Sequence, residues 1–151
     1  MTVYRITHTK WADKLVGSGY AARWNSSGLL VIYAAENISL ACLENLVHRN
    51  GFGLDADFSL ITITIPDEIP IVELKSAILP HNWNDNNENA HLICRKYGDA
   101  WVRSQKSSAL IVPSAIIENE KNIIINVNHS DFLKIKIVKI QPFSFDSRLN
   151  I

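Results

Sequence analysis

The sequence predicts a compact α+β domain with a mixed, mostly antiparallel sheet. Short runs of β-branched residues recur along the chain and indicate strands. Only the segments 37–49 and 88–105 have helical patterns, and they do not alternate with the strands as in a parallel βαβ protein. A length of 151 residues suits one domain, which we place at 1–151.

The expected strands are short apolar runs. They span residues 2–6, 30–34, 58–65, 110–112, 122–126 and 134–140. In the run FSLITITI at 58–65, the three isoleucines Ile61, Ile63 and Ile65 share one face. This period of two is typical of a half-buried antiparallel strand.

The first helix, 37–49, places a carboxylate on its apolar stripe. Leu40, Leu43 and Val47 form the stripe, and Glu44 lies within it. Burying an unpaired carboxylate costs several kcal/mol, so Glu44 has an arginine as its partner or faces a cleft. The alternative is an edge glutamate that reaches water.

The second helix, 88–105, contains a glycine. We expect a break at Gly98, with Asp99 available to cap a second short helix.

Composition excludes several classes of protein. The 15 Lys and Arg balance 15 Asp and Glu, and no basic cluster is present to neutralise nucleic-acid phosphates. Cys42 and Cys94 stand apart, and His48, His91 and His129 have no ligand spacing, so we expect no metal site and a reducing compartment. Without a secretion signal or an apolar run of about 18 residues, we expect a cytoplasmic protein with no membrane partner.

Two loops carry polar residues that are candidates for a site. Arg23, in the glycine- and serine-rich segment 17–28, is suited to binding phosphate oxygens, or is a solvated charge on a flexible loop. Ser114 follows Pro113 at a strand end and is a hydrogen-bonding group of a pocket, or a turn residue. The four tryptophans are expected to bury their rings in the core; they are Trp11, Trp24, Trp83 and Trp101.

Several short motifs follow one another along nearly the whole chain. They are VYRI at 3–6, GSG with ARWNSSG within 17–28, VIYAAENISLACLENLVH at 31–48, GDAW at 98–101, LIVPSA at 110–115, NVNH at 126–129 and PFSFDSRL at 142–149. Their order and spacing resemble the RES-domain family, named for an arginine, a glutamate and a serine. The chain departs from the family pattern at Ala21 and Ala22, where glycines are usual, and at Val127, where proline is usual.

The resemblance implies which residues act. Arg23, Glu44 and Ser114 would be catalytic, and Arg5, Arg23, Tyr33, Ser114 and Asn126 would contact NAD. It also implies a fold similar to ADP-ribosyltransferases and cleavage of the nicotinamide–ribose bond of NAD, by phosphorolysis or hydrolysis. NAD would then be the substrate, with no cofactor, and inorganic phosphate would be an optional co-substrate.

The resemblance also implies partners. The family supplies the toxin of Xre-RES toxin-antitoxin pairs, so we expect an Xre-type helix-turn-helix antitoxin and a homodimer within a larger complex. Direct binding to nucleic acid is not expected. Two alternatives stay open: a mono-ADP-ribosyltransferase that modifies a cellular protein, and a non-catalytic binding module.

Overall fold

One seven-stranded sheet forms the body of the protein in the computed structural model, which describes residues 1–49, 53 and 55–149. The strand order is β4-β5-β6-β2-β1-β3-β7. All neighbours are antiparallel except β4 and β5, as the sequence predicts for most of the sheet. The strands are β1 (Thr2–His8), β2 (Val31–Ala35), β3 (Phe58–Thr64), β4 (Ile71–Glu73), β5 (Ala109–Pro113), β6 (Lys121–Asn126) and β7 (Lys136–Phe143).

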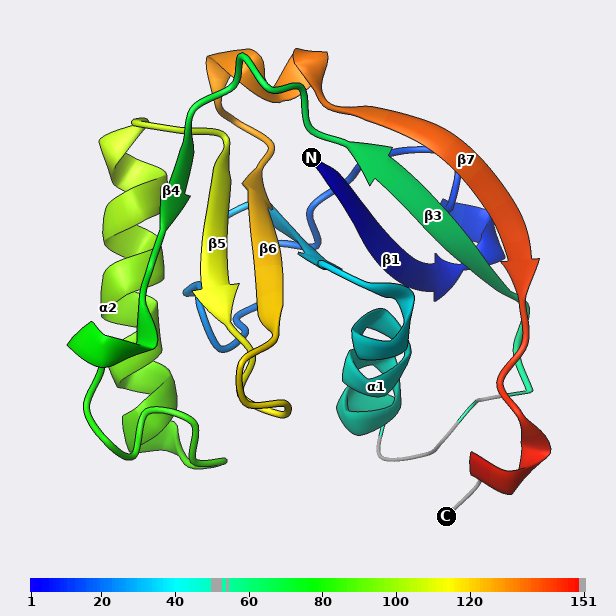
Figure 1. Ribbon diagram of the computed structural model, residues 1–151, viewed down its shortest axis with the longest axis horizontal. Coiled ribbons are helices and arrows are strands. Elements are labelled where there is room, and N and C mark those ends of the chain that lie inside the picture. The colour runs from blue at the N-terminus through cyan, green and yellow to red at the C-terminus, as the bar shows by residue number, and fades with distance from the viewer. Residues whose placement is uncertain (50–52, 54, 150–151) are drawn as a thin grey trace.

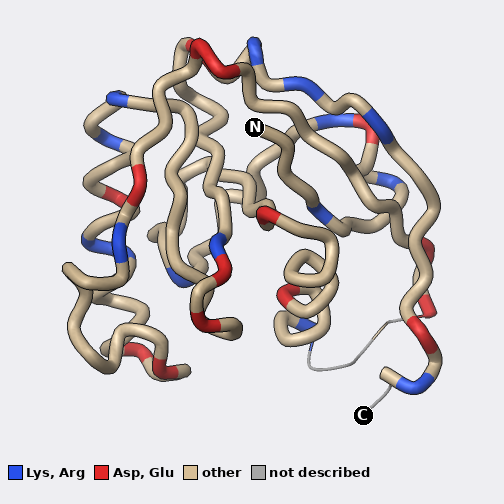
Figure 2. Tube along the Cα trace, in the orientation of Figure 1, with Lys and Arg blue, Asp and Glu red and all other residues tan. Residues whose placement is uncertain are grey.

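Two α-helices lie on different parts of this sheet. The helix α2 (Glu88–Ser104) runs alongside β4, β5 and β6, whereas α1 (Ile38–Arg49) lies near the middle of the molecule (Figure 1). Short 3-10 turns complete the chain; they are η1 (Thr9–Trp11), η2 (Ser76–Ile78), η3 (Ser130–Lys134) and η4 (Ser147–Leu149). Basic positions follow β7, while acidic positions gather near the loop that joins β5 to β6 (Figure 2).

The sheet is weakly joined between β2 and β1. These strands pair only at Tyr4 and Ala35, whereas β1 pairs with β3 along its whole length. The weak pairing leaves room at the middle of the sheet, beside α1. Side chains from β1 and β2 face this opening, which becomes the candidate site.

The core follows the period of two that the strands predict. On β6, Ile123 and Ile125 pack on one face of the sheet, and Ile124 packs on the other with Trp24 and Trp101. Burying a side chain of this size contributes roughly 1.5–3 kcal/mol to stability. The alternation therefore holds the sheet in register.

The predicted break of α2 at Gly98 is wrong. The helix is continuous, and a Cβ atom at Gly98 would lie 1.8 Å from the carbonyl oxygen of Trp24. Asp99 caps no helix, because its carboxylate is engaged by Ser26. It accepts one hydrogen bond from the Ser26 amide at 2.9 Å and one from the Ser26 hydroxyl at 2.6 Å. The glycine permits close packing between a helix and a loop, a reason that a single sequence does not reveal.

Other predictions also need correction. Trp11 is 54% exposed, and Val47 is 50% exposed, so neither is a core residue. The strand β4 was not predicted, because three residues give little periodic signal. The last strand begins at Lys136 rather than 134, since the preceding residues form the turn η3.

Candidate functional site

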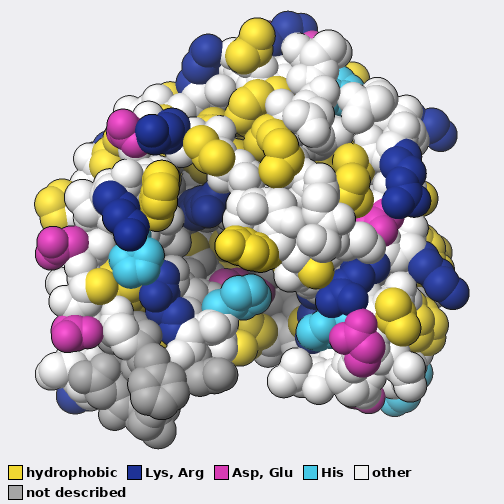
Figure 3. Space-filling model, turned by 180° about the vertical axis from the view of Figure 1, so that it is seen from behind, with side chains coloured by type: hydrophobic (Ala, Val, Ile, Leu, Met, Phe, Trp, Pro, Cys, Tyr) yellow, Lys and Arg dark blue, Asp and Glu magenta, His cyan; other side chains and the backbone are white. Residues whose placement is uncertain are grey.

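A cavity of about 550 Å³ opens where β1, β2 and α1 meet. The loop around residues 18–25 closes one side, and we call this space the α1 cavity. Seen from behind, the surface is recessed at the lower centre, and charged and histidine side chains surround the recess (Figure 3). A pocket of this size is in the range that binds small molecules.

One face of α1 lines this cavity with polar side chains. The polar residues of this wall are Glu44, Asn45, His48 and Arg49, and Ala41 lies among them. Their spacing of three and four residues places them on one side of the helix. Leu40, one turn before Glu44 at the edge of this face, is buried in a core cluster with Ile6 and Phe58, and this packing fixes the helix with its polar side chains at the cavity.

Glu44 is half-buried and held in place by two neighbours. Its Oε1 accepts hydrogen bonds from the amide of Asn122 on β6 and, at 3.4 Å, from the hydroxyl of Ser114. Among residues 1–49, 53 and 55–149 no arginine forms an ion pair with Glu44, so its hydrogen-bond partners are neutral. Of the two interpretations that the sequence left open, the structure supports a cleft-facing carboxylate.

Arg5 brings a positive charge to the same cavity from β1. It is half-buried, and burial lowers the pKa of its guanidinium. It makes none of the ion pairs found among residues 1–49, 53 and 55–149. A buried cation without a counterion is costly, so an anionic ligand here would offset the cost of its desolvation.

Arg49 is a second cation of the cavity, and it was not predicted. Its Nε donates to Oδ1 of Asn45 at 2.9 Å, its Nη2 donates to Nε2 of His8 at 3.0 Å, and it stacks on Phe58. None of these partners is a carboxylate, so the charge remains available to a ligand. The i, i+4 spacing from Asn45 was the signal in the sequence that could have identified it.

Tyr33 lines the cavity from β2, but its hydroxyl is already engaged. It donates to Oδ1 of Asn25 at 2.8 Å and accepts from the amide of Trp24 at 3.1 Å. Burial raises the pKa of Tyr33, so the phenol stays protonated. The aromatic ring, rather than the hydroxyl, is therefore the part of Tyr33 that is free to contact a ligand.

Arg23 does not line the α1 cavity. Its guanidinium donates to the carbonyl oxygens of Trp83 at 3.0 Å and Asp85 at 3.2 Å. Its chain neighbours Ala22 and Asn25 do line the cavity. The structure thus separates Arg23 from the two cations of the cavity and places it against the loop 83–85.

Ser114 lies at the edge of the α1 cavity. It is 5% exposed, and it reaches the α1 cavity only through its hydrogen bond to Glu44. Its hydroxyl oxygen also accepts from the amides of Ile116 and Ile117, each at 3.1 Å. With its oxygen held in this way, the serine directs its single proton at Glu44.

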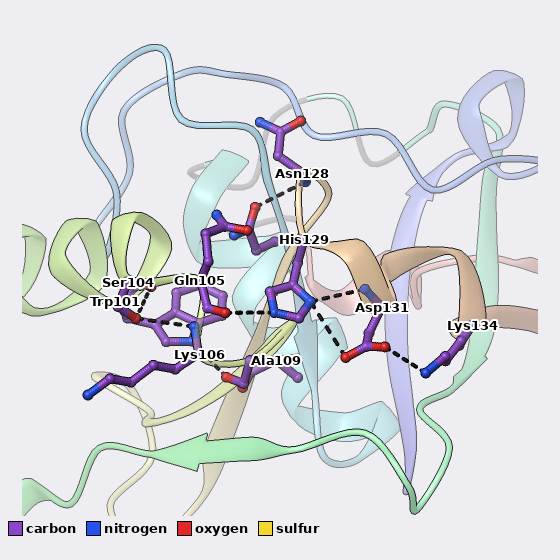
Figure 4. A network of polar contacts seen from close by, with 11 residues as sticks. Trp101, Ser104, Gln105, Lys106, Ala109, Asn128, His129, Asp131 and Lys134 are labelled. Carbon is purple, nitrogen blue, oxygen red and sulfur yellow. Dashed lines mark hydrogen bonds and ion pairs between the residues drawn. The ribbon is translucent and has the colours of Figure 1, made fainter.

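Asn126 is another predicted contact that does not line the α1 cavity. Its side chain is 0% exposed, and its Oδ1 accepts from the amide of Asn128 at 3.0 Å. In the same turn the ring of His129 accepts from the amide of Asp131, so its Nε2 carries the proton donated to the carbonyl of Gln105 (Figure 4). The NVNH motif therefore ties β6 to the end of α2, and a direct contact between Asn126 and a ligand requires a different conformation.

No cluster of metal-binding side chains is found in the part of the chain that the structure describes. Within it, no three His, Cys, Asp or Glu side chains come together as ligands for an ion. Cys42 and Cys94 are both free thiols. No helix in that part is long and apolar enough to cross a membrane.

The fold and the cavity define a small α+β domain with one carboxylate and two arginines facing a shared space. The chain belongs to the RES domain family, whose model matches residues 2–146. This confirms the family that the motifs indicated.

Relatives and a solved structure agree with this assignment. The chain is 37% identical to the "Prs ADP-ribosylating toxin" of Sphingobium sp. over 144 residues, which cover 91% of this chain and 88% of that protein. It is 37% identical to "Toxin Res" of Photorhabdus laumondii over 155 residues, with 99% and 97% covered. A chain in the crystal structure of the M. tuberculosis MbcT-MbcA toxin-antitoxin complex superposes with a TM-score of 0.78 at 18% identity, covering 95% of this chain and 84% of that one, and supports the fold.

Proposed function

We propose that the protein is a toxin that cleaves the nicotinamide–ribose bond of NAD in the α1 cavity. The observation that carries the proposal is the placement of Glu44 with two arginines that lack carboxylate partners among the described residues. The relatives are named as toxins, and one of them as an ADP-ribosylating toxin, which supports NAD as the substrate.

The two cations suit the diphosphate of the substrate. Arg5 and Arg49 outnumber Glu44 among the formally charged residues lining the cavity, so its net charge is +1. Arginine binds phosphate oxygens through two parallel hydrogen bonds, which orient the ligand as well as attract it. We assign the diphosphate to Arg5 and Arg49 instead of Arg23.

The carboxylate suits the reacting end of the substrate. Breaking the bond to nicotinamide places positive charge on the ribose, and a fixed anion stabilises that charge most where the transition state forms. Asn122 and Ser114 hold Glu44, so it needs little reorganisation during the reaction. The ring of Tyr33 is placed to stack on the flat nicotinamide.

The acceptor defines two forms of this function. In the first, inorganic phosphate or water takes the ADP-ribosyl group, and the protein depletes NAD. In the second, the acceptor is a side chain of a cellular protein. The name of the Sphingobium relative favours the second form and is the reason to retain it.

We also propose an antitoxin partner. The solved structural neighbour is part of a toxin-antitoxin complex, which supports such a partner for this chain. An Xre-type helix-turn-helix antitoxin that blocks the cavity, and a homodimer within the complex, remain predictions for co-expression and mass measurement.

The experiment that tests the function is incubation of the purified protein with NAD. Nicotinamide release is followed by chromatography, with and without inorganic phosphate and with a bacterial lysate. Release in buffer alone or only with phosphate supports NAD breakdown, whereas label transferred from NAD to a protein supports ADP-ribosylation. Folded protein that releases no nicotinamide under any of these conditions would refute the proposal.

A further inference from the structure

A second concave site is lined by the β5–β6 loop and shares none of its lining residues with the α1 cavity. Its volume is also about 550 Å³, and we call it the β5–β6 groove. The walls come from the β4–η2 segment at 73–76, from the loop at 81–84, and from the β5–β6 segment at 111–121. In Figure 1 the loop joining β5 to β6 lies between the η2 region and α1.

One residue connects the groove to the carboxylate of the α1 cavity. Ser114 lines the groove, and its hydroxyl donates to Glu44, which lines the cavity. The side chains of Ser114 and Glu44, whose oxygens lie 3.4 Å apart, therefore form the boundary between the two spaces at this point. A group bound in the groove beside Ser114 would lie close to a ribose held at Glu44.

Arg23 fixes the loop at 81–84 that forms one wall of the groove. Its guanidinium binds the carbonyl oxygens of Trp83 and Asp85, and Trp83 lines the groove together with Asn84. Two of the residues predicted to be catalytic, Arg23 and Ser114, thus belong to the groove and its wall, while only Glu44 lies directly in the cavity. This arrangement links the groove to the same reaction.

The groove has the opposite charge to the α1 cavity. Lys121 pairs with Glu73 at 2.7 Å, which lowers the pKa of Glu73 and raises that of Lys121. The remaining charged residues of the lining are Lys75, Glu118 and Glu120, so the lining carries a net charge of −1. The acidic positions near the β5–β6 loop are visible in Figure 2. A groove of this charge disfavours free phosphate and favours a cationic ligand.

We propose that the β5–β6 groove binds a Lys- and Arg-rich segment of an acceptor protein and presents a side-chain hydroxyl or amine to the ribose in the α1 cavity. This inference rests on the proposed function, and it selects the protein-modifying form. The acidic lining of the groove suits such a segment by charge. Glu118 and Glu120 would attract its basic side chains.

The transfer step balances without a further reactant. The bond between the ribose carbon and nicotinamide breaks, and its electron pair leaves with nicotinamide, which becomes neutral. A lone pair of the acceptor oxygen or nitrogen forms the new bond to that carbon. The proton of the acceptor passes to the carboxylate of Glu44 or to solvent.

Two fluorescent peptides test the proposal by binding alone. One has the repeat Lys-Ser-Arg-Gly and the other the repeat Glu-Ser-Glu-Gly, and fluorescence anisotropy measures their affinities at low salt. We expect the basic peptide to bind at least tenfold more tightly. We expect Glu118→Lys combined with Glu120→Lys to remove about tenfold of that affinity, and Glu118→Gln alone to remove about threefold.

The control is Asp13→Lys combined with Glu68→Lys, which makes the same charge change as the double groove variant at two exposed residues outside both spaces. It should bind the basic peptide as the unaltered protein does. Equal affinity for both peptides, or equal losses in the groove and control variants, would overturn the proposal.

A second measurement separates this proposal from the proposed function. With NAD present, mass spectrometry should detect ADP-ribosylated basic peptide, and the ratio of modified peptide to released nicotinamide should fall about tenfold in the groove variant. Selective peptide binding without any nicotinamide release would refute the enzyme function and not the groove. Nicotinamide release that responds to phosphate, with the basic peptide neither selectively bound nor modified, would refute the groove and not the enzyme.

Discussion

The α1 cavity and the β5–β6 groove have similar volumes but opposite charge. Each measures about 550 Å³, yet the cavity carries one carboxylate and two arginines that have no carboxylate partner in the described part of the chain, whereas the groove carries an excess of glutamate. Their walls also differ. The cavity forms where the sheet is weakly joined between β2 and β1, and the groove forms beneath a loop. Charge and position, rather than size, therefore distinguish the proposed dinucleotide site from the proposed acceptor site.

Three arginines make the same distinction at the level of side chains. Arg23 donates to two backbone carbonyls and so fixes a loop. Arg5 and Arg49 face the cavity without a carboxylate partner in the described residues. An arginine engaged by the backbone organises structure, whereas one without a counterion can bind an anionic ligand.

The largest expected effect comes from removing the charge of the cavity. Glu44→Gln should reduce nicotinamide release from NAD by about 10²–10³-fold, because the ribosyl cation loses its fixed anion. Glu68→Gln, at an exposed position outside both spaces, serves as the control and should retain full activity. An active Glu44→Gln enzyme would remove Glu44 from the mechanism.

Trp24 contacts both regions, because its amide donates to Tyr33 of the cavity and its ring centroid lies 5.7 Å from that of Trp83 in the groove. The packing around Trp24 should be sensitive to a single methyl group. Gly98→Ala places a Cβ atom against the Trp24 carbonyl, and the strain should lower the free energy of unfolding by about 3 kcal/mol. Chemical denaturation measures this loss. Ala100→Gly, at an exposed position of the same helix, should cost only about 1 kcal/mol. Similar losses in the two variants would contradict the close approach at Gly98.

The arginines should separate binding from structure. Arg5→Met and Arg49→Met should each raise the KM for NAD about tenfold, because each removes a phosphate contact. Arg23→Met should change this KM less and instead lower the melting temperature, since it frees the loop 83–85. The opposite pattern, with the larger KM effect at Arg23, would show that the loop rearranges around the substrate.

The side chain between the two spaces should have a smaller effect. Ser114→Ala removes one donor to Glu44 and should lower kcat about fivefold while leaving the KM for NAD nearly unchanged. Ser27→Ala, in an exposed loop, is the matched control. A kcat equal to that of the unaltered protein would show that Asn122 alone holds the carboxylate.

The smallest effect is a pH dependence at the edge of the cavity. His8 accepts a hydrogen bond from Arg49 and must be neutral to do so; partial burial and the charge of Arg49 lower its pKa. The unfolded chain therefore takes up a proton first, and stability should fall slightly as the pH drops through about 6.5. Thermal unfolding from pH 8 to pH 5 measures the slope. The variant His8→Gln should flatten it, and an unchanged slope would assign the dependence to other groups.

Much of the fold could be predicted because it depends on local patterns. The isoleucines of β3 and β6 alternate with a period of two, and the apolar stripe of α1 placed Glu44 near the core. Gly98 could not be interpreted in this way. A glycine that breaks a helix and a glycine that admits a neighbouring carbonyl look identical in one sequence, and only packing distinguishes them.

The site shows the same division. The polar spacing along α1 was present in the sequence, but the environment of Arg49 depends on His8 and Phe58, which are distant along the chain. Arg23 was equally suited to phosphate by residue type. Its engagement with the carbonyls of Trp83 and Asp85 depends on contacts about 60 residues apart.

The sequence by itself determined the class of fold, the family through its ordered motifs, and the presence of a carboxylate on an apolar helix face. Those features follow from local periodicity and residue type, which the chain carries without folding. The tertiary structure alone decided which arginines lack a carboxylate partner among the described residues, that the hydroxyl of Ser114 meets Glu44, and that two spaces of opposite charge adjoin there. These properties depend on desolvation and on distances between remote segments, and both exist only once the sheet and helices have packed.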